Sequence, residues 1–128
     1  MVSQTTLGIR ISVNCKYQET YSRPDQRHYF FSYRISIENT SDQTVKLLRR
    51  HWHIFDSGAT VQEVEGEGVV GQQPVLSPGE TYSYESACTL NTDIGSMHGT
   101  YLMHREADGT KFEVAIPEFN LITDYRLN

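Results

Sequence analysis

Hydrophobic residues recur at every second position over much of this chain, with polar residues between them. This period is typical of β-strands with one buried face, because successive side chains point to opposite sides of a sheet. The pattern predicts strands over residues 9–15, 29–37, 45–55, 60–65, 81–86, 101–105 and 112–116. Residues 117–121 are expected to add a final edge strand. We therefore expect an all-β domain.

Turn-forming residues separate these runs. Asp56-Ser57-Gly58 is expected to form a tight turn, and Ser77-Pro78-Gly79-Glu80 suits a type II turn, with Pro at the second position and Gly at the third. Asp108-Gly109 between two strands predicts a hairpin. The polar residues 17–28 contain Pro24 and are expected to form a long surface loop. Short strands at this spacing, without a helical stretch, indicate a sandwich or barrel of seven or eight strands.

The composition places the chain among ordinary soluble domains. Its 128 residues fit one domain with a core over about residues 7–122, and 38% of them are hydrophobic. The net charge of -5 argues against the whole surface binding nucleic acid, and a local basic patch stays open as an alternative. The sequence has neither a secretory signal nor an apolar run long enough to span a bilayer. We expect a cytoplasmic protein with Cys15 and Cys88 reduced, although a bridge between them is geometrically conceivable.

Gly66, Gly68 and Gly71 match the G-x-G-x-x-G motif of dinucleotide-binding folds. In those folds the glycines lead into a helix whose N-terminus holds a pyrophosphate. Here Gln72-Gln73-Pro74 follows, so a helix is not expected, and Glu65 and Glu67 would repel phosphate. Two interpretations remain for the loop from Gly66 to Pro74. It either crosses between sheets as a structural element, or it contacts a protein partner or an anion.

The valines within this loop favour one of these ligands. Val69 and Val70 are apolar and are expected at a loop tip, where they suit a protein partner better than an anion. We therefore take Gly66, Gly68, Val69, Val70 and Gly71 as candidate binding residues.

His51 and His53 lie two positions apart on a predicted strand and share one face with Arg49. Two imidazoles at this spacing can chelate a divalent transition metal, but a site needs a third ligand, and none is local in sequence. His98 and His104 become candidates only if the fold brings their strand alongside. The alternatives are an exposed polar strand face or a nucleic-acid surface with Trp52 as a stacking platform.

The opposite face of this strand is expected to carry Leu48, Arg50, Trp52 and Ile54, and we expect Trp52 to pack in the core with Leu48 and Ile54. The sequence contains none of the G-x-S-x-G, H-E-x-x-H or C-x-x-C motifs. No catalytic residue and no cofactor are predicted.

Five sequence blocks, spread in order over residues 9–121, closely resemble the ApaG family. These blocks are Leu47-Leu48-Arg49-Arg50-His51-Trp52, Glu63 through Pro74, Leu76-Ser77-Pro78-Gly79, Gly95-Ser96-Met97-His98-Gly99-Thr100-Tyr101 and Ile116-Pro117-Glu118-Phe119. The resemblance implies an immunoglobulin or fibronectin type III-like β-sandwich of two antiparallel sheets. The glycines of the family map onto Gly66, Gly68 and Gly71, and the family supplies no catalytic residue to carry over.

The resemblance also implies a binding role. Domains of this family occur in an F-box protein of ubiquitin ligases and in a protein that interacts with DNA polymerase delta, and both settings suggest protein–protein interaction. We therefore expect a non-enzymatic module that binds a protein partner through the loop from Gly66 to Pro74 and a sheet edge. A homodimer stays open, and no membrane partner is expected.

The alternative function is binding of a small ligand. The bacterial family is linked to cobalt resistance and magnesium efflux, which suggests a cation site at His51 and His53. Its name comes from proximity to a diadenosine tetraphosphate hydrolase, which suggests a nucleotide polyphosphate at the glycine-rich loop.

Overall fold

The computed structural model describes residues 1–57 and 60–126, which form nine β-strands and three short 3₁₀ helices. The strands are β1 (Val2–Thr6), β2 (Ile9–Tyr17), β3 (Tyr29–Asn39), β4 (Val45–Asp56), β5 (Thr60–Glu67), β6 (Val75–Leu76), β7 (Thr81–Leu90), β8 (Ile94–Arg105) and β9 (Lys111–Ile122). The 3₁₀ helices are η1 (Glu19–Tyr21), η2 (Pro24–Gln26) and η3 (Asp124–Arg126). No helix within this part of the chain is long and apolar enough to cross a membrane.

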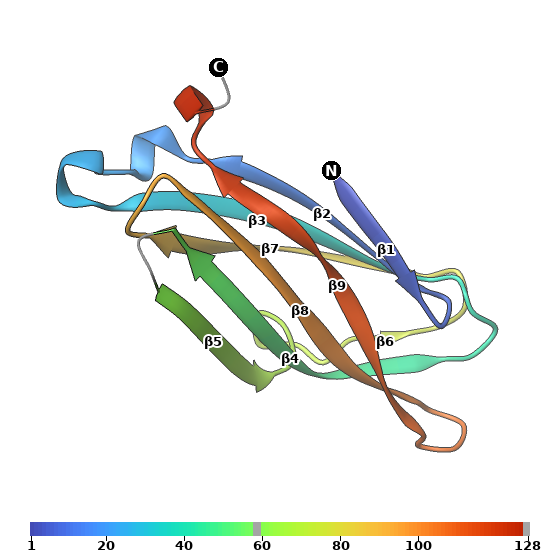
Figure 1. Ribbon diagram of the computed structural model, residues 1–128. Helices are drawn as coiled ribbons and strands as arrows, with labels where there is room; N and C mark the ends of the chain where they lie inside the picture. The colour runs from blue at the N-terminus through green and yellow to red at the C-terminus, as the bar shows by residue number, and fades with distance from the viewer. Residues whose placement is uncertain (58–59, 127–128) are drawn as a thin grey trace.

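The strands form two antiparallel sheets that pack face to face (Figure 1). One sheet has the order β1-β2-β3-β7, and the other has the order β5-β4-β8-β9, with the short β6 paired to β4. This arrangement is the predicted immunoglobulin or fibronectin type III-like sandwich. The expected seven or eight strands become nine because β1 and β6 have no marked alternation. The predicted edge strand at residues 117–121 is the second half of β9, which is the edge of its sheet.

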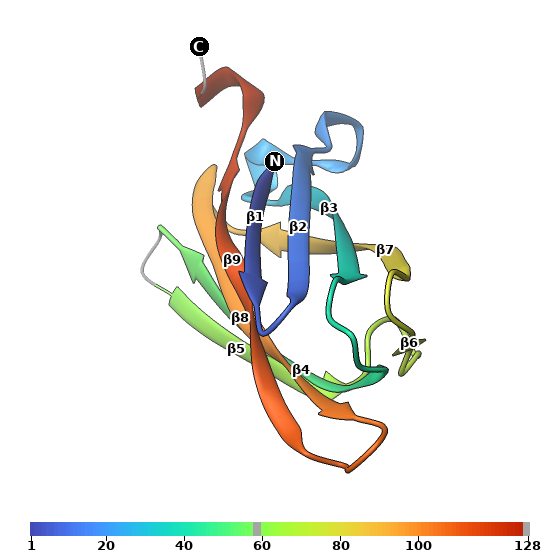
Figure 2. The ribbon, with the colours of Figure 1, turned by 90° about the vertical axis from the view of Figure 1, so that its right-hand side faces the viewer.

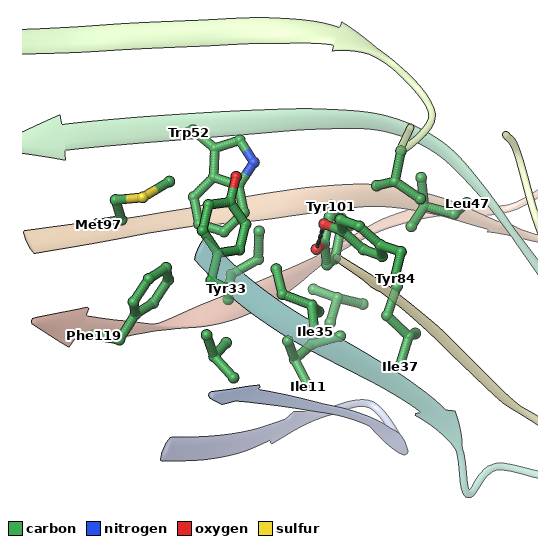
Figure 3. Packing of buried hydrophobic residues seen from close by; sticks show 14 of the residues in the cluster. Ile11, Tyr33, Ile35, Ile37, Leu47, Trp52, Tyr84, Met97, Tyr101 and Phe119 are labelled. Carbon is green, nitrogen blue, oxygen red and sulfur yellow. Dashed lines mark hydrogen bonds between the residues drawn. The ribbon is translucent and has the colours of Figure 1, made fainter. Parts of the chain in front are cut away.

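The core lies between the sheets and follows the alternation of the sequence. In β2 and β3 the inward residues Ile9, Ile11, Ile35 and Ile37 expose none of their surface. Trp52 of β4 is buried as expected, at 3% exposure, and packs edge-on against Tyr33 with 5.7 Å between ring centroids (Figure 3). These contacts across the sheets supply the hydrophobic stabilisation that holds the sandwich together.

A bulge in β4 changes which leucine enters the core. The pairing with β8 shifts between Leu47 and Arg49, so Leu47 is buried at 1% exposure while Leu48 is only partly buried. The expectation that Leu48 packs with Trp52 in the core is therefore wrong, because one extra residue in a strand reverses the facing of those before it. The predicted sharing of faces holds beyond the bulge, where Trp52 points inward.

The turns are largely as predicted. Glu80 N donates a 3.0 Å hydrogen bond to Ser77 O, and Gly79 has a φ of +87°, as a type II turn requires. Asp108 and Gly109 lie in the loop that connects β8 to β9 as a hairpin. The turn expected at Asp56-Ser57-Gly58 reaches outside the described residues, but the strands on either side of it do pair as a hairpin. The loop at residues 17–28 contains η1 and η2.

The two long sides of the sandwich differ. On one side β9 packs against β1 and β2, and Figure 2 shows β1 and β9 running side by side. On the other side the edge strands are β7 of one sheet and β5 of the other, and a cavity lies between them. We call these the closed side and the open side.

Candidate functional site

The open side contains a cavity of about 370 Å³ between the two sheets. Four consecutive residues of β7, Ser86 to Thr89, line it from one edge, and Gln62 and Val64 of β5 line it from the other. Trp52, Tyr33 and Met97 also line it, and all three belong to the hydrophobic core. The cavity therefore joins a free strand edge to the aromatic interior, and we call it the inter-sheet cleft.

A buried pair of hydroxyls connects the sheets beside this cleft. Tyr84 of β7 and Tyr101 of β8 share a hydrogen bond between their phenol oxygens, shown as a dashed line in Figure 3. Burial raises the pKa of both phenols above the ordinary value. Both groups therefore stay neutral at physiological pH, when each can still donate or accept a hydrogen bond.

Arg50 places a cation in the cleft. Its Nη1 donates hydrogen bonds to the carbonyl oxygens of Glu67 at 2.9 Å and Gly68 at 3.0 Å. Among the described residues no carboxylate lies within ion-pairing distance of Arg50. The guanidinium lies over Gly66, where a Cβ atom would come within 2.8 Å of Nη1. Gly66 thus leaves room for a cation that no acidic side chain of the described structure neutralises.

The glycine-rich loop is a compact turn that folds back onto the β4 bulge. Val69 and Gln72 exchange backbone hydrogen bonds of 2.8 and 2.9 Å, while Val70 and Gly71 between them have positive φ angles of 47° and 76°. The carbonyl oxygen of Leu48 accepts bonds from Gly68 N and Gln73 Nε2, each at 2.9 Å. The prediction that no helix follows Gly71 is confirmed, because the chain continues into β6.

The two valines of the loop have different environments. Val69 is fully buried at 0% exposure, whereas Val70 is 61% exposed, and both line the cleft. The expectation that both lie at a loop tip is therefore wrong for Val69, which is a core residue. Val70 also carries strain, since a β-branched residue rarely adopts a positive φ.

The loop offers few backbone groups to an anion. The N–H groups of Gly68, Val69 and Gln72 already donate to carbonyl oxygens. A phosphate site built on backbone amides needs several such groups free and converging. The polyphosphate alternative thus gains no support from the conformation of the loop.

A second cluster of polar side chains lies on the outer face of the five-stranded sheet. His51 and His53 are neighbours on β4, with 4.5 Å between ring centroids, and Glu63 and Glu65 oppose them from β5. His98 of β8 pairs with His53 and stacks on its ring at 4.9 Å with an interplanar angle of 12°. His104 is elsewhere on β8, where its Nε2 lies 2.6 Å from Glu106.

The acidic half of this cluster is absent from the ligands that the sequence predicts. Neither Glu63 nor Glu65 is expected there, although the turn expected at Asp56-Ser57-Gly58 contains the signal that could have found them. A hairpin around that turn places His53 opposite Glu63 and His51 opposite Glu65, and this is the observed register. Antiparallel partners on one face lie close enough to interact.

The cysteines are both free and partly buried. Burial raises the pKa of each thiol to about 11, with the nearby Asp56 carboxylate raising the pKa of Cys88 further. Such thiols stay protonated and are poor nucleophiles at neutral pH. Cys88 lines the inter-sheet cleft and contributes a small, weakly polar surface to it.

Comparison with known proteins identifies the family. The ApaG domain matches residues 19–105, more than half of the chain. The chain belongs to the ApaG family. It is 48% identical to "Protein ApaG" of Brucella canis, over 94% of this chain and 92% of that protein. It is 49% identical to the protein of the same name from Methylobacterium sp. (strain 4-46), over the same shares.

Solved structures are also similar to this chain. A crystal structure of an ApaA protein from Bordetella pertussis is 46% identical, covers 91% of this chain and 94% of its own, and superposes with a TM-score of 0.87. A protein from Archaeoglobus fulgidus, at 12% identity and a TM-score of 0.52, shares the fold alone. The ApaG match includes the cleft, the glycine-rich loop and the histidine cluster, and the names of these ApaG relatives state no enzymatic activity.

Proposed function

We propose that this ApaG domain is a non-enzymatic binding module that takes up an extended segment of a partner protein on its open side. The segment adds a strand to the free edge of β7, inserts an apolar side chain into the inter-sheet cleft, and places an acidic side chain at Arg50. The observation that carries the proposal is the presence of an unneutralised arginine beside an aromatic-lined cavity and a free strand edge.

The two edges of the open side differ in how well they are protected against pairing. β5 carries Glu63, Glu65 and Glu67 within eight residues, and charged side chains on an edge strand discourage strand addition. β7 is ten residues long, contains no proline or lysine, and has Glu85 as its one charged residue. An unprotected edge of this length is the kind used in β-augmentation, where backbone hydrogen bonds supply affinity.

The charge of the cleft selects the chemistry of the partner. An arginine held by backbone carbonyl oxygens keeps its positive charge and still has free N–H donors. A carboxylate suits this guanidinium because a charged hydrogen bond contributes about 1.5–3 kcal/mol. We therefore expect an acidic residue in the bound segment, near the end of the cleft formed by the glycine-rich loop.

The apolar part of the cleft supplies the remaining contacts. Trp52 and Tyr33 expose little surface to water, yet they line a cavity large enough for an aliphatic or aromatic side chain. Val70 adds an exposed apolar side chain at the same end as Arg50. An apolar anchor next to an acidic residue is thus the expected recognition pattern.

Selection from a random peptide display library tests the proposal, with the Arg50→Gln variant used for counter-selection. We expect enriched peptides that combine an acidic and an apolar residue, and an affinity about tenfold to a hundredfold weaker for Arg50→Gln. Arg49→Gln is the matched control, because Arg49 is exposed and does not line the cleft. Its affinity should equal that of the unmodified chain.

N-methylation of the peptide separates strand addition from loss of folding. Methylation at alternate residues removes donors to the β7 edge and should weaken binding, whereas methylation at the positions between them should not. Chemical-shift changes should centre on residues 86–89. The proposal would be overturned if the enriched peptides bound the Arg50→Gln variant equally well. It would also be overturned by shift changes confined to β5, or by occupation of the cleft by a second copy of this chain.

A further inference from the structure

We propose that His51, His53 and Glu63 form a binding site for a divalent transition-metal cation of the zinc class, with Glu65 as a positioning residue. The site lies on the outer face of the five-stranded sheet and is separate from the inter-sheet cleft, whose lining includes none of these four residues. It therefore stands or falls independently of peptide binding.

The donor atoms already converge. One ligand atom from each of His51, His53 and Glu63 can be chosen so that all three lie within 4.8 Å of one another. Glu63 Oε1 lies 3.3 Å from His53 Nδ1 and 3.7 Å from His51 Nε2. Ligands at about 2.0–2.1 Å from a tetrahedral zinc ion are roughly 3.3 Å apart, so the cluster needs only small side-chain rotations to enclose a cation.

His51 has one nitrogen without a hydrogen-bond partner. Nε2 of this ring is buried and forms no hydrogen bond within the described part of the chain. The other nitrogen, Nδ1, lies 3.2 Å from Glu65 Oε1. A carboxylate beside Nδ1 favours the tautomer with its proton there, which leaves the lone pair of Nε2 available on the side of Glu63. This carboxylate–histidine arrangement is a common support of metal sites.

The surrounding structure holds the ligands in place. His51 and His53 extend from the middle of β4, which is paired on both sides by β5 and β8. The ring of His98 stacks on His53 and restricts its rotation. Ligands on rigid paired strands lose little conformational entropy on binding, unlike ligands on loops.

The donor set determines the class of cation. Two imidazoles and one carboxylate suit zinc and its neighbours, whereas magnesium prefers oxygen ligands and keeps several waters. Two glutamates at the site supply negative charge that attracts a divalent cation. With three protein ligands, the fourth position is left for water or for a group of another molecule.

Calorimetric titration of the untagged protein with Zn²⁺ tests the site, with Mg²⁺ titrated in parallel. We expect one zinc ion per chain, a zinc-dependent rise in melting temperature, and no heat from Mg²⁺. His53→Ala and Glu63→Gln should abolish zinc binding, while Glu65→Gln should weaken it about tenfold through loss of the positioning carboxylate.

A matched control lies on the same sheet. His104 and Glu106 form a single histidine–glutamate pair outside the cluster, so His104→Ala should leave zinc affinity unchanged. Circular dichroism without metal checks that each variant folds. Zinc binding that survives His53→Ala, or absence of binding to the unmodified chain at millimolar Zn²⁺, would show that the cluster is only a set of surface ion pairs.

Discussion

On the closed and the open side of the sandwich, the two sheets are joined by different kinds of contact. On the closed side β9 covers β1 and β2, and residues such as Ile11, Ile116 and Leu121 are buried with almost no exposure. On the open side the sheets are joined by a hydrogen bond between two tyrosines and border a half-open cavity that Arg50 lines. One side is thus filled with aliphatic groups, while the other includes polar groups and unfilled volume.

Under the proposed binding role, this difference separates stability from recognition within one small core. A close-packed aliphatic side contributes most to the free energy of unfolding, because every buried methylene counts. In the same proposal, a side with free volume, a cation and a free strand edge contributes less to stability and more to recognition. The following experiments test whether the two roles separate as the structure indicates.

Truncation of one aliphatic residue on each side should give the largest contrast. Ile11→Ala on the closed side should lower the free energy of unfolding by about 2–5 kcal/mol, because Ile11 is fully buried and its loss leaves a cavity. Val64→Ala on the open side should cost about 1 kcal/mol or less, since Val64 is partly buried and borders existing free volume. Urea denaturation measures both, and equal losses would contradict the distinction.

Removal of one hydroxyl from the tyrosine pair should have the next largest effect. Tyr101→Phe leaves the hydroxyl of Tyr84 buried without its partner, which should cost about 1–3 kcal/mol. The double variant Tyr84→Phe with Tyr101→Phe removes both polar groups and should regain part of that loss. If the second substitution lowers the free energy of unfolding by as much again as the first, the two hydroxyls do not depend on each other.

The buried residues of the closed side could be predicted from the sequence, although the edge strand β1 could not, and the cavity of the open side could not be predicted either. Alternation in residues 9–15 and 29–37 directly identified the inward residues that fill the core. The cavity depends on how far apart β5 and β7 lie, which no local pattern encodes. The bulge that turns Leu47 inward instead of Leu48 is also a property of pairing between strands, and period two alone cannot locate it.

The residues of the candidate sites also fall into those that local spacing identifies and those that only the pairing of strands identifies. His51 and His53 were recognised because their spacing places them on one face of one strand. Glu63 was missed because its approach depends on the register of the β4–β5 hairpin. Arg50 was assigned correctly to the face of Trp52, but its lack of an acidic partner could be established only from the positions of the glutamates around it.

Alkaline pH should lower the free energy of unfolding by a smaller amount. The size of this loss tests how well the open side excludes water. Burial raises the pKa of Cys15 and Cys88 from 9.0 to about 11, so the unfolded chain loses these protons first. The free energy of unfolding should therefore be intact below pH 9 and fall as the pH rises toward 11. Both thiols are partly exposed, and solvent screening limits the loss.

Replacement of one cysteine shows which thiol causes the fall of the free energy of unfolding with pH. Cys88→Ala should reduce the slope, because Cys88 lines the cleft yet is buried enough to resist ionisation. Denaturation at pH values between 8 and 10 measures the change. An unaltered slope in this variant would show that water enters the cleft freely and that Cys15 alone resists ionisation.

The smallest expected effect is a gain in stability at a strained turn on the open side. Val70 and Gly71 occupy a two-residue turn with positive φ angles, and Leu7 and Gly8 occupy a similar turn between β1 and β2 on the closed side. Val70→Asn should stabilise the fold by about 1 kcal/mol, because asparagine tolerates this conformation better than a β-branched residue. Leu7→Asn is the matched control and should gain less, since leucine is not β-branched.

Peptide affinity then shows whether Val70 takes part in recognition. If Val70→Asn stabilises the protein but weakens its affinity for the selected peptides, the strain at Val70 is retained for its apolar contact at the cleft. If both substitutions gain equally and peptide affinity is unchanged, Val70 takes no part in recognition, and the end of the cleft is defined by Arg50 alone.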